Sequence, residues 1–241
     1  MSGRLIAIGV GPGDPELMTL KAVRKLASAD VVAYFAKAGN GSNARRIAAA
    51  HLPPGVEELP LDYPVTTEIP RHDAAYQAAI CDFFDTAAQQ VADRLDAGRT
   101  VAVIAEGDPL FYGSYMHLHV RLADRYAAEI GPGITGMSGC WSAVATPIAQ
   151  GDDVFAVLLG TLPEAELERR LADADAAVVM KLGRHLAKVR RALARTGRLD
   201  RAIYVERGTM EKAQMLPLAD KPDDEAPYFS MVLVPGWENK P

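Results

Sequence analysis

The protein has 241 residues, of which 49% are hydrophobic and 24% are charged, and its formal net charge is −5. This length and composition are typical of a globular protein with one large or two small domains. The acidic balance argues against a sequence-independent nucleic-acid-binding protein, and no apolar run approaches the roughly 20 residues that a membrane-spanning helix needs.

Apolar spacing in the first half of the chain predicts strands separated by helices. Asp14, Pro15 and Glu16 suit the start of a helix, as N-cap, first residue and acidic first turn. We expect strands over residues 4–10, 30–35 and 100–105, helices over residues 14–27, 43–51 and 72–98, and a short strand or extended loop over residues 57–67.

The second half continues this alternation. We expect helices over residues 114–125, 163–174 and 184–195 and through Cys140 and Trp141, and strands over residues 128–130, 154–159, 176–182, 201–206 and 229–234. Strands that alternate with helices predict an α/β protein with largely parallel pairing.

The N-terminal residues and the two cysteines indicate the cellular compartment and the redox state of the protein. The short apolar run after Arg4 ends in Gly-Pro-Gly-Asp, which is typical of a first strand and turn and not of a signal peptide. Cys81 and Cys140 lack metal-ligand spacing, and a disulfide is not expected without an export signal. The sequence therefore predicts a reduced, cytoplasmic protein with no membrane or nucleic-acid partner.

The most informative stretch is Glu106-Gly107-Asp108-Pro109, directly after the apolar run Thr100–Ala105. In open α/β sheets, ligands bind at the carboxyl ends of such strands. The two carboxylates are compatible with a metal site, with an acid/base pair, or with acceptors for a cationic or polyhydroxyl ligand. A structural turn or helix cap is a further interpretation, since Asp-Pro is a common helix start.

Two glycine-rich segments accompany this stretch. The glycines at positions 9, 11 and 13 do not form the dinucleotide pattern G-x-G-x-x-G, Pro12 has no N–H to offer a phosphate, and Asp14 would repel one. We interpret this loop as a tight turn, or as one that admits a neutral or cationic ligand. Residues 131–139 are rich in small side chains, so a ligand could reach their backbone.

Two cations follow predicted strands in the second half of the chain, namely Lys181 and Arg207. Each is compatible with a surface salt bridge or with an anion-binding role. The helix predicted after Lys181 is strongly basic, which usually marks a solvated face but could also receive an anionic ligand.

Five segments together resemble one family, the tetrapyrrole methylases, which are class III S-adenosylmethionine-dependent methyltransferases. In chain order the segments are GVGPGDPELMTLKA, AEGDPLFYG, IGPGITGMSG, VVMKLG and VERGT. The resemblance covers nearly the whole chain, with Gly136 and Leu182 as mild departures from the residues that relatives carry. It implies two α/β domains, expected over residues 1–112 and 113–241, each with a mixed or mostly parallel sheet flanked by helices, and an active site in the cleft between them.

Within the family, three segments most resemble the branch that methylates carbon 20 of precorrin-2 in cobalamin biosynthesis. They are DPELMTLKAVR, GDPLFYGSYMHLHVRL and MKLGRHLAKVRRAL. The arginine-glycine run that follows this aspartate in uroporphyrinogen III methylases is absent here. The open alternatives are a cobalt-bearing ring substrate, methylation at another ring carbon, and a catalytically inactive tetrapyrrole-binding protein.

The resemblance also implies site residues. Contacts to S-adenosylmethionine, which would leave as S-adenosylhomocysteine, fall on Pro12, Glu106, Gly107, Asp108, Phe111, Thr135, Gly136, Leu182 and Gly208. The candidates for a general base are Tyr112, His117 and Glu106. The substrate carries many carboxylates, so a basic rim is expected from Arg45, Arg46, Arg71, Lys181, Arg184 and Arg207. The family further implies a homodimer, and no residue set commits the protein to holding a metal.

Overall fold

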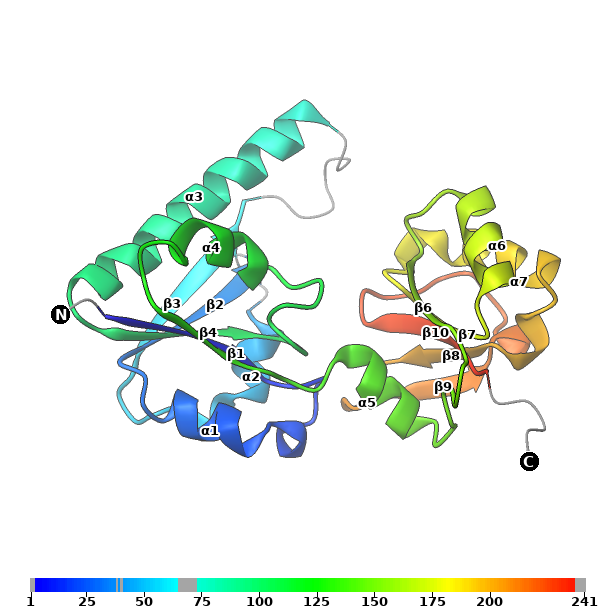
Figure 1. Ribbon diagram of the computed structural model, residues 1–241, viewed down its shortest axis with the longest axis horizontal. Coiled ribbons are helices and arrows are strands. Elements are labelled where there is room, and N and C mark those ends of the chain that lie inside the picture. The colour runs from blue at the N-terminus through cyan, green and yellow to red at the C-terminus, as the bar shows by residue number, and fades with distance from the viewer. Residues whose placement is uncertain (1–2, 38, 40, 65–72, 237–241) are drawn as a thin grey trace. The chain divides into compact units, whose positions relative to one another are not determined.

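The structure is a computed structural model that describes residues 3–37, 39, 41–64 and 73–236 (Figure 1). Contacts divide the chain into two compact units, Met1–Gly136 and Met137–Pro241. The boundary expected after Tyr112 falls inside the first of these units, because the helix and strand that follow Tyr112 pack on the first sheet.

The first unit is built on a parallel sheet with the strand order β3-β2-β4-β1-β5. Its strands are β1 (Arg4–Gly9), β2 (Val31–Lys37), β3 (Glu57–Tyr63), β4 (Thr100–Ala105) and β5 (Ala128–Gly131). All of their pairings are parallel, so the carboxyl ends of the strands lie along one edge. The parallel α/β prediction is therefore confirmed for this sheet.

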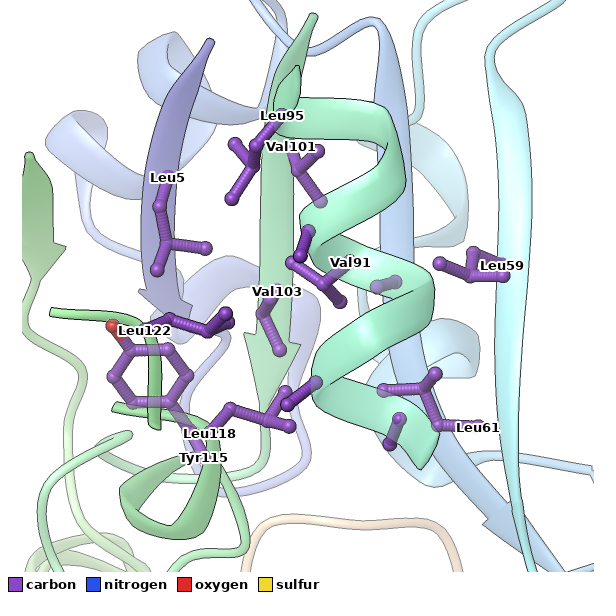
Figure 2. Close-up of a cluster of buried hydrophobic side chains, with 14 of the residues drawn as sticks. Leu5, Leu59, Leu61, Val91, Leu95, Val101, Val103, Tyr115, Leu118 and Leu122 are labelled. Carbon is purple, nitrogen blue, oxygen red and sulfur yellow. The ribbon is translucent and has the colours of Figure 1, made fainter. Parts of the chain in front are cut away.

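Helices cover both faces of the first sheet (Figure 1). Their bounds are α1 (Leu20–Leu26), α2 (Asn43–Ile47), α3 (Ala74–Asp96) and α4 (Tyr115–Leu122). Because side chains alternate along a strand, Leu5 faces α3 and α4 whereas Ile6 faces α1 and α2. Figure 2 shows Val91 and Leu95 of α3 against Val101 and Val103 of β4. Full burial of each such side chain contributes about 1.5–3 kcal/mol.

The helix expected over residues 14–27 is interrupted. Asp14 caps a single 3-10 turn, Pro15–Leu17, through a 2.9 Å hydrogen bond from the Glu16 N–H. Met18 is extended, and Thr19 caps α1 by accepting a bond from the Ala22 N–H at 3.1 Å. The chain thus contains two N-cap residues, Asp14 and Thr19, and each begins a helical segment of its own.

The second unit contains a mixed sheet with the order β6-β7-β10-β8-β9. Its strands are β6 (Phe155–Leu159), β7 (Ala176–Met180), β8 (Ile203–Glu206), β9 (Gln214–Pro217) and β10 (Ser230–Val234). Only β6 and β7 pair in parallel, so the expectation of largely parallel pairing is wrong here. Strand β9 escapes sequence-based prediction because it is mostly exposed and lacks an apolar run.

Two layers of side chains bury this second sheet. Helices α6 (Glu164–Asp173) and α7 (Leu186–Arg195) pack on one face around Leu167, Leu186 and Val232. Helix α5 (Gly136–Ala143) packs on the other face through Trp141. As in the first unit, the strand residues that face each layer alternate along the chain.

Candidate functional site

The parallel order of the first sheet places three loops next to one another. Strands β4, β1 and β5 are neighbours, so the loops that follow them lie together at the carboxyl edge. These loops carry six of the residues predicted to bind the methyl donor, namely Pro12, Glu106, Gly107, Asp108, Phe111 and Thr135, and Gly136 begins helix α5 directly after the third loop.

Glycines allow the three loops to touch through their backbones. A Cβ atom added to Gly9 would lie 2.5 Å from the Gly107 carbonyl oxygen and 2.6 Å from the Gly133 nitrogen. Gly11 and Gly107 exchange two backbone hydrogen bonds of 2.8 and 3.4 Å. Close backbone packing thus explains the glycine spacing that does not match a phosphate-binding loop.

Asp108 holds two of these loops in place. Its carboxylate accepts a 2.9 Å bond from the Leu110 N–H and a 3.1 Å bond from the Gly133 N–H. The structural turn weighed in the sequence analysis therefore exists. An ionised carboxylate has about four acceptor positions, so Asp108 retains capacity for a ligand.

Glu106 lies at the end of the central strand and faces helix α2. The Asn43 side chain and the Ala44 backbone N–H both donate to its carboxylate, and Arg46 provides a nearby positive charge. Burial outweighs these contacts and raises the pKa of Glu106 to about 7. Such a pKa suits a group that exchanges protons at neutral pH.

The other two predicted bases occupy different surroundings. Tyr112 is 43% exposed and adopts a left-handed backbone (φ 53°), with its ring edge-on to Phe111 at 4.8 Å. His117 lies on α4, and its ring stacks on Phe84 at 4.1 Å. Desolvation, and then the charge of Arg121, lower the pKa of His117, so its neutral form is favoured.

The arginines of α2 are already engaged by protein groups. Arg45 forms two bonds of 2.9 and 3.0 Å to Glu58, which also accepts from the Tyr34 hydroxyl. Arg46 donates to the side-chain oxygen of Asn43. The third candidate in this unit, Arg71, lies outside the described residues.

Asn43 is a polar contact that the sequence analysis did not single out. It follows β2, which neighbours β4 in the sheet, so the fold brings Asn43 to the edge where Glu106 lies. The signal that could have found it is its place just after a predicted strand and a glycine-rich turn.

In the second sheet, residues predicted to bind a ligand also lie at the carboxyl ends of strands. Strands β7 and β8 are each antiparallel to β10, so their carboxyl ends lie at the same edge. Lys181 and Arg207 follow these strands, both in the left-handed region (φ 55° and 51°). Such backbone conformations are costly for residues with a side chain and often accompany functional sites.

The neighbouring residues at this edge differ in what they can offer a ligand. Leu182 is fully buried in the hydrophobic core, so only its backbone could make a contact. Gly208 lies against α5, where an added Cβ would meet the Cys140 sulfur at 2.7 Å. Arg184 is exposed, and Arg207 donates to Glu206 at 2.9 Å.

Two buried polar atoms near Gly208 have no partner in the described ranges. They are the indole N–H of Trp141 and the hydroxyl of Thr209. An unpaired buried donor costs about 1–3 kcal/mol, so a bound group is expected to satisfy it. S-adenosylmethionine is rich in acceptor atoms and has no phosphate, so the residues present fit this methyl donor.

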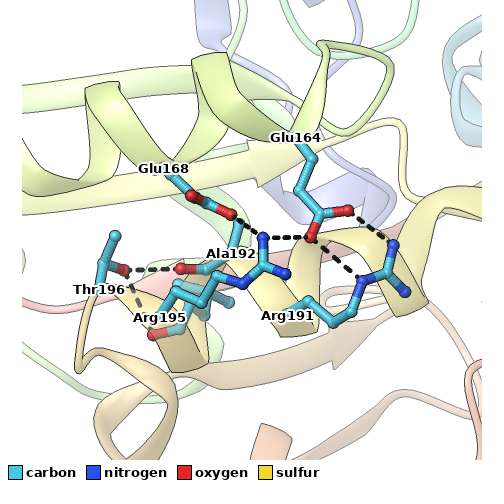
Figure 3. Close-up of polar contacts among 7 residues, drawn as sticks. Glu164, Glu168, Arg191, Ala192, Arg195 and Thr196 are labelled. Atoms are coloured by element: carbon cyan, nitrogen blue, oxygen red, sulfur yellow. Dashed lines mark hydrogen bonds and ion pairs between the residues drawn. The ribbon is translucent and has the colours of Figure 1, made fainter.

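Helix α7 uses most of its positive charge internally. Arg191 donates to Glu164 of α6 at 2.7 and 3.1 Å, and Arg195 bridges Glu164 and Glu168 at 3.1 and 2.6 Å (Figure 3). Arg190 binds Asp224 at 2.8 Å. This basic helix is therefore largely a neutralised, solvated face. Arg184, in the 3-10 turn Gly183–His185 that precedes the helix, remains a candidate for binding an anion.

The fold is that of an α/β protein, and the loops after its strands match no phosphate-binding pattern. The profile of the tetrapyrrole (corrin/porphyrin) methylases matches residues 4–220, and the chain belongs to this family. No helix within the described ranges is long and apolar enough to cross a membrane.

Relatives cover the chain almost completely. A precorrin-2 C(20)-methyltransferase of Sinorhizobium sp is 64% identical over 99% of this chain and 98% of its own length. The cobalamin biosynthesis protein CobIJ of Mycobacterium tuberculosis is 53% identical over 99% of this chain, which spans 47% of that longer protein. A cobalt-precorrin-2 C(20)-methyltransferase of Salmonella typhimurium is 29% identical over 99% of both chains.

Solved structures share the fold. A cobalt precorrin-4 methyltransferase aligns with a TM-score of 0.72 at 24% identity and covers 96% of this chain and 94% of its own. A uroporphyrin-III C-methyltransferase of Thermus thermophilus, complexed with S-adenosylhomocysteine, aligns with a TM-score of 0.66 at 24% identity over 96% and 97% of the two chains. The two-domain α/β architecture is thereby confirmed.

Proposed function

We propose that this protein is a precorrin-2 C(20)-methyltransferase that uses S-adenosylmethionine. The observation that carries the proposal is the 64% identity to the Sinorhizobium enzyme over 98% of that enzyme's length. The relative named for cobalt-precorrin-2 is only 29% identical, which favours a metal-free ring as the substrate.

The protein's contribution to this reaction is mainly alignment. When bound, S-adenosylmethionine supplies an electrophilic methyl group, and carbon 20 of the reduced ring is an enamine-like nucleophile. We propose that the backbones around Gly107, Thr135 and Gly208 hold the donor, with Pro12, Phe111, Gly136 and Leu182 completing the contacts. The interlocked glycines support this assignment, because a stiff backbone edge reduces the entropy lost on reaching reactive geometry.

Asp108 has two roles in this proposal. It fixes the loop at Gly133, and its remaining lone pairs accept from a polar group of the donor. Glu106 is the strongest of the three candidate bases, because its carboxylate is held by neighbours and its pKa lies near 7. Tyr112 and His117 remain candidates.

The carboxylates of the ring require local positive charge in an acidic protein. We propose Lys181, Arg184 and Arg207 as contacts on the second unit, with Arg71 as a further candidate. Arg45 and Arg46 are weaker candidates, because Glu58 and Asn43 already occupy them. A cytoplasmic homodimer remains a proposal carried by the family resemblance, and light scattering after size-exclusion chromatography would measure its mass.

The decisive experiment incubates the purified protein with S-adenosylmethionine and precorrin-2 without oxygen. We expect mass spectrometry to show one added methyl group and carbon NMR of the product to place it on carbon 20. A parallel incubation with cobalt-precorrin-2 tests the alternative substrate. A methyl group at another ring carbon, or binding without turnover by folded protein, would contradict the proposal.

A further inference from the structure

The loop after the central strand ends in a serine whose hydroxyl does not cap its own helix. Ser114 occupies the N-cap position of α4, where serine is preferred because its side chain can accept from the first turn. Within α4, whose residues are all described, no N–H makes this capping bond. The Ser114 hydroxyl instead shares a hydrogen bond with the hydroxyl of Tyr63, the last residue of β3. Because β2 lies between β3 and β4, this bond joins parts of the chain that follow two non-adjacent strands.

Aromatic side chains hold the Tyr63 ring in place. The ring stacks on Phe35 of β2 with centroids 5.7 Å apart, and its centroid lies 4.6 Å from that of Phe83 and 6.1 Å from that of Phe84, both on α3. Phe84 is buried, and Phe35 and Phe83 pack against the core of the first unit. Tilted, stacked and edge-on aromatic pairs at these distances are favourable. The Tyr63 hydroxyl therefore has a fixed position from which to hold Ser114.

The loop between β4 and α4 contains a strained residue. Tyr112 lies in the left-handed region, with a φ angle of 53°. A residue with a side chain keeps such a conformation only where its surroundings hold it. Asp108 fixes the start of the loop through its bond to the Gly133 N–H, and Ser114, two residues after Tyr112, is bound to Tyr63. Two side-chain contacts thus enclose the strained segment.

Between these two contacts the loop exposes apolar side chains. Leu110 and Tyr112 are 47% and 43% exposed, and Phe111 is half-buried, with its ring edge-on to that of Tyr112 at 4.8 Å. Adjacent apolar side chains on the surface are typical of a contact with a ligand or partner, whereas single ones are common everywhere. Residues that bind ligands are also often found on loops that a rigid scaffold positions. The loop therefore presents an apolar surface in a fixed conformation.

We infer that Tyr63 is a positioning residue whose hydroxyl acts through Ser114 to keep the loop after β4 in the conformation that offers Phe111 to the methyl donor. This inference rests on the proposed function for the identity of the ligand. It adds to the site a residue from the edge strand β3, which carries none of the residues predicted to bind a ligand.

The first test needs no ligand. Tyr63→Phe removes the hydroxyl and keeps the ring in the aromatic cluster, and Ser114→Ala removes the other partner of the bond. Hydrogen exchange read by mass spectrometry measures the opening of residues 108–114. We expect exchange in this loop to become about three- to tenfold faster in either variant, the scale of one lost hydrogen bond. The double variant should show no further increase, because the two hydroxyls form a single contact.

Tyr34→Phe is the matched control. It removes a tyrosine hydroxyl from the neighbouring strand β2, where that hydroxyl donates to Glu58 at 2.9 Å. Exchange in the loop should then match the wild type. Wild-type exchange in both folded Tyr63→Phe and folded Ser114→Ala would overturn the positioning role. Faster exchange throughout the first unit, with no excess in the loop, would also overturn it, because the bond would then stabilise the fold in general.

The second test measures affinity for S-adenosylhomocysteine by calorimetric titration. We expect Tyr63→Phe to bind about two- to tenfold more weakly, because binding must then restore the held conformation, and Tyr34→Phe to bind like the wild type. In turnover with precorrin-2, Tyr63→Phe should raise the KM for the donor more than it lowers kcat. Unchanged donor affinity despite faster loop exchange would refute the link to the donor. If the wild type binds no S-adenosylhomocysteine, the proposed function fails, whereas the exchange data still decide whether Tyr63 holds the loop.

Discussion

The carboxylate of Asp108 accepts a hydrogen bond of 3.1 Å from the backbone N–H of Gly133. Asp108 follows β4 and Gly133 follows β5, and β1 lies between these strands, so the bond crosses the carboxyl end of a neighbouring strand. A single side chain thereby links the loop after the central strand to the loop after the edge strand. With the donor contact that we propose for Asp108, donor binding and local stability are coupled at this residue.

Replacement of Asp108 with alanine is expected to affect both properties. The Gly133 and Leu110 N–H groups lose their acceptor, which should lower the free energy of unfolding by about 1–3 kcal/mol. Affinity for S-adenosylhomocysteine should fall about ten- to a hundredfold. Asp108→Asn keeps one acceptor oxygen, so its stability and its donor affinity should lie between those of the wild type and of Asp108→Ala. Calorimetric titration and urea unfolding measure these quantities, and unchanged donor affinity in a folded Asp108→Ala would contradict the assignment.

Replacement of Gly9 with alanine should disturb the same edge by crowding alone. The new Cβ would lie 2.5 Å from the Gly107 oxygen and 2.6 Å from the Gly133 nitrogen, both backbone atoms. We expect a loss of roughly 1–3 kcal/mol in unfolding free energy, with weaker donor binding. Gly131→Ala is the matched control, because its Cβ would make only an ordinary 3.5 Å contact with the Ala7 oxygen. Equal stability of the two variants would argue against interlocked loops.

The titration of Glu106 should be visible in protein stability. Its folded pKa of about 7 lies above the unfolded value of about 4.3, so the folded state binds the proton more tightly. The resulting stabilisation is fully present below pH 4 and is lost as the pH rises through 7. Relative to the wild type, Glu106→Gln should therefore gain about 1–3 kcal/mol between pH 5 and pH 8. Urea unfolding at several pH values measures this difference, and a constant difference would contradict the raised pKa.

Glu164 should contribute a small stabilisation that depends on salt. It pairs with Arg191 and Arg195 between α6 and α7, and these pairs hold its pKa below the usual range (Figure 3). Glu164→Gln should lower the melting temperature slightly at low salt, and the difference should shrink at high salt because exposed ion pairs are screened. Glu211→Gln, at an exposed position, is the control. A difference that salt leaves unchanged would point to lost packing instead.

Reversal of the charge at Arg184 should affect binding of the ring substrate and not binding of the methyl donor. Arg184 is exposed after β7, so Arg184→Glu should raise the KM for the carboxylate-rich ring and leave the affinity for S-adenosylhomocysteine unchanged. Arg169→Gln on the exposed face of α6 serves as the control for a general change of charge. Equal losses for both ligands in Arg184→Glu would refute a role in binding the substrate.

Much of the fold follows from local pattern. The run Thr100–Ala105 has the length and the β-branched content of a buried parallel strand, and the structure contains that strand. The long helix α3 was equally predictable from its apolar repeat. Strand β9 and the break at Met18 were not, because β9 is stabilised by pairing with β8 and the break depends on a choice between two caps.

The sequence by itself determined the family and the two edges that carry the candidate residues, because ordered motifs and strand ends are local properties of the chain. Only the tertiary structure decided what those residues do to one another. It tied Asp108 to Gly133, placed Asn43 between Arg46 and Glu106, and paired the arginines of α7 with α6. Apart from the bond between Arg46 and Asn43 within α2, these contacts join residues distant in sequence. Their energies depend on distance and burial, which residue spacing alone does not specify.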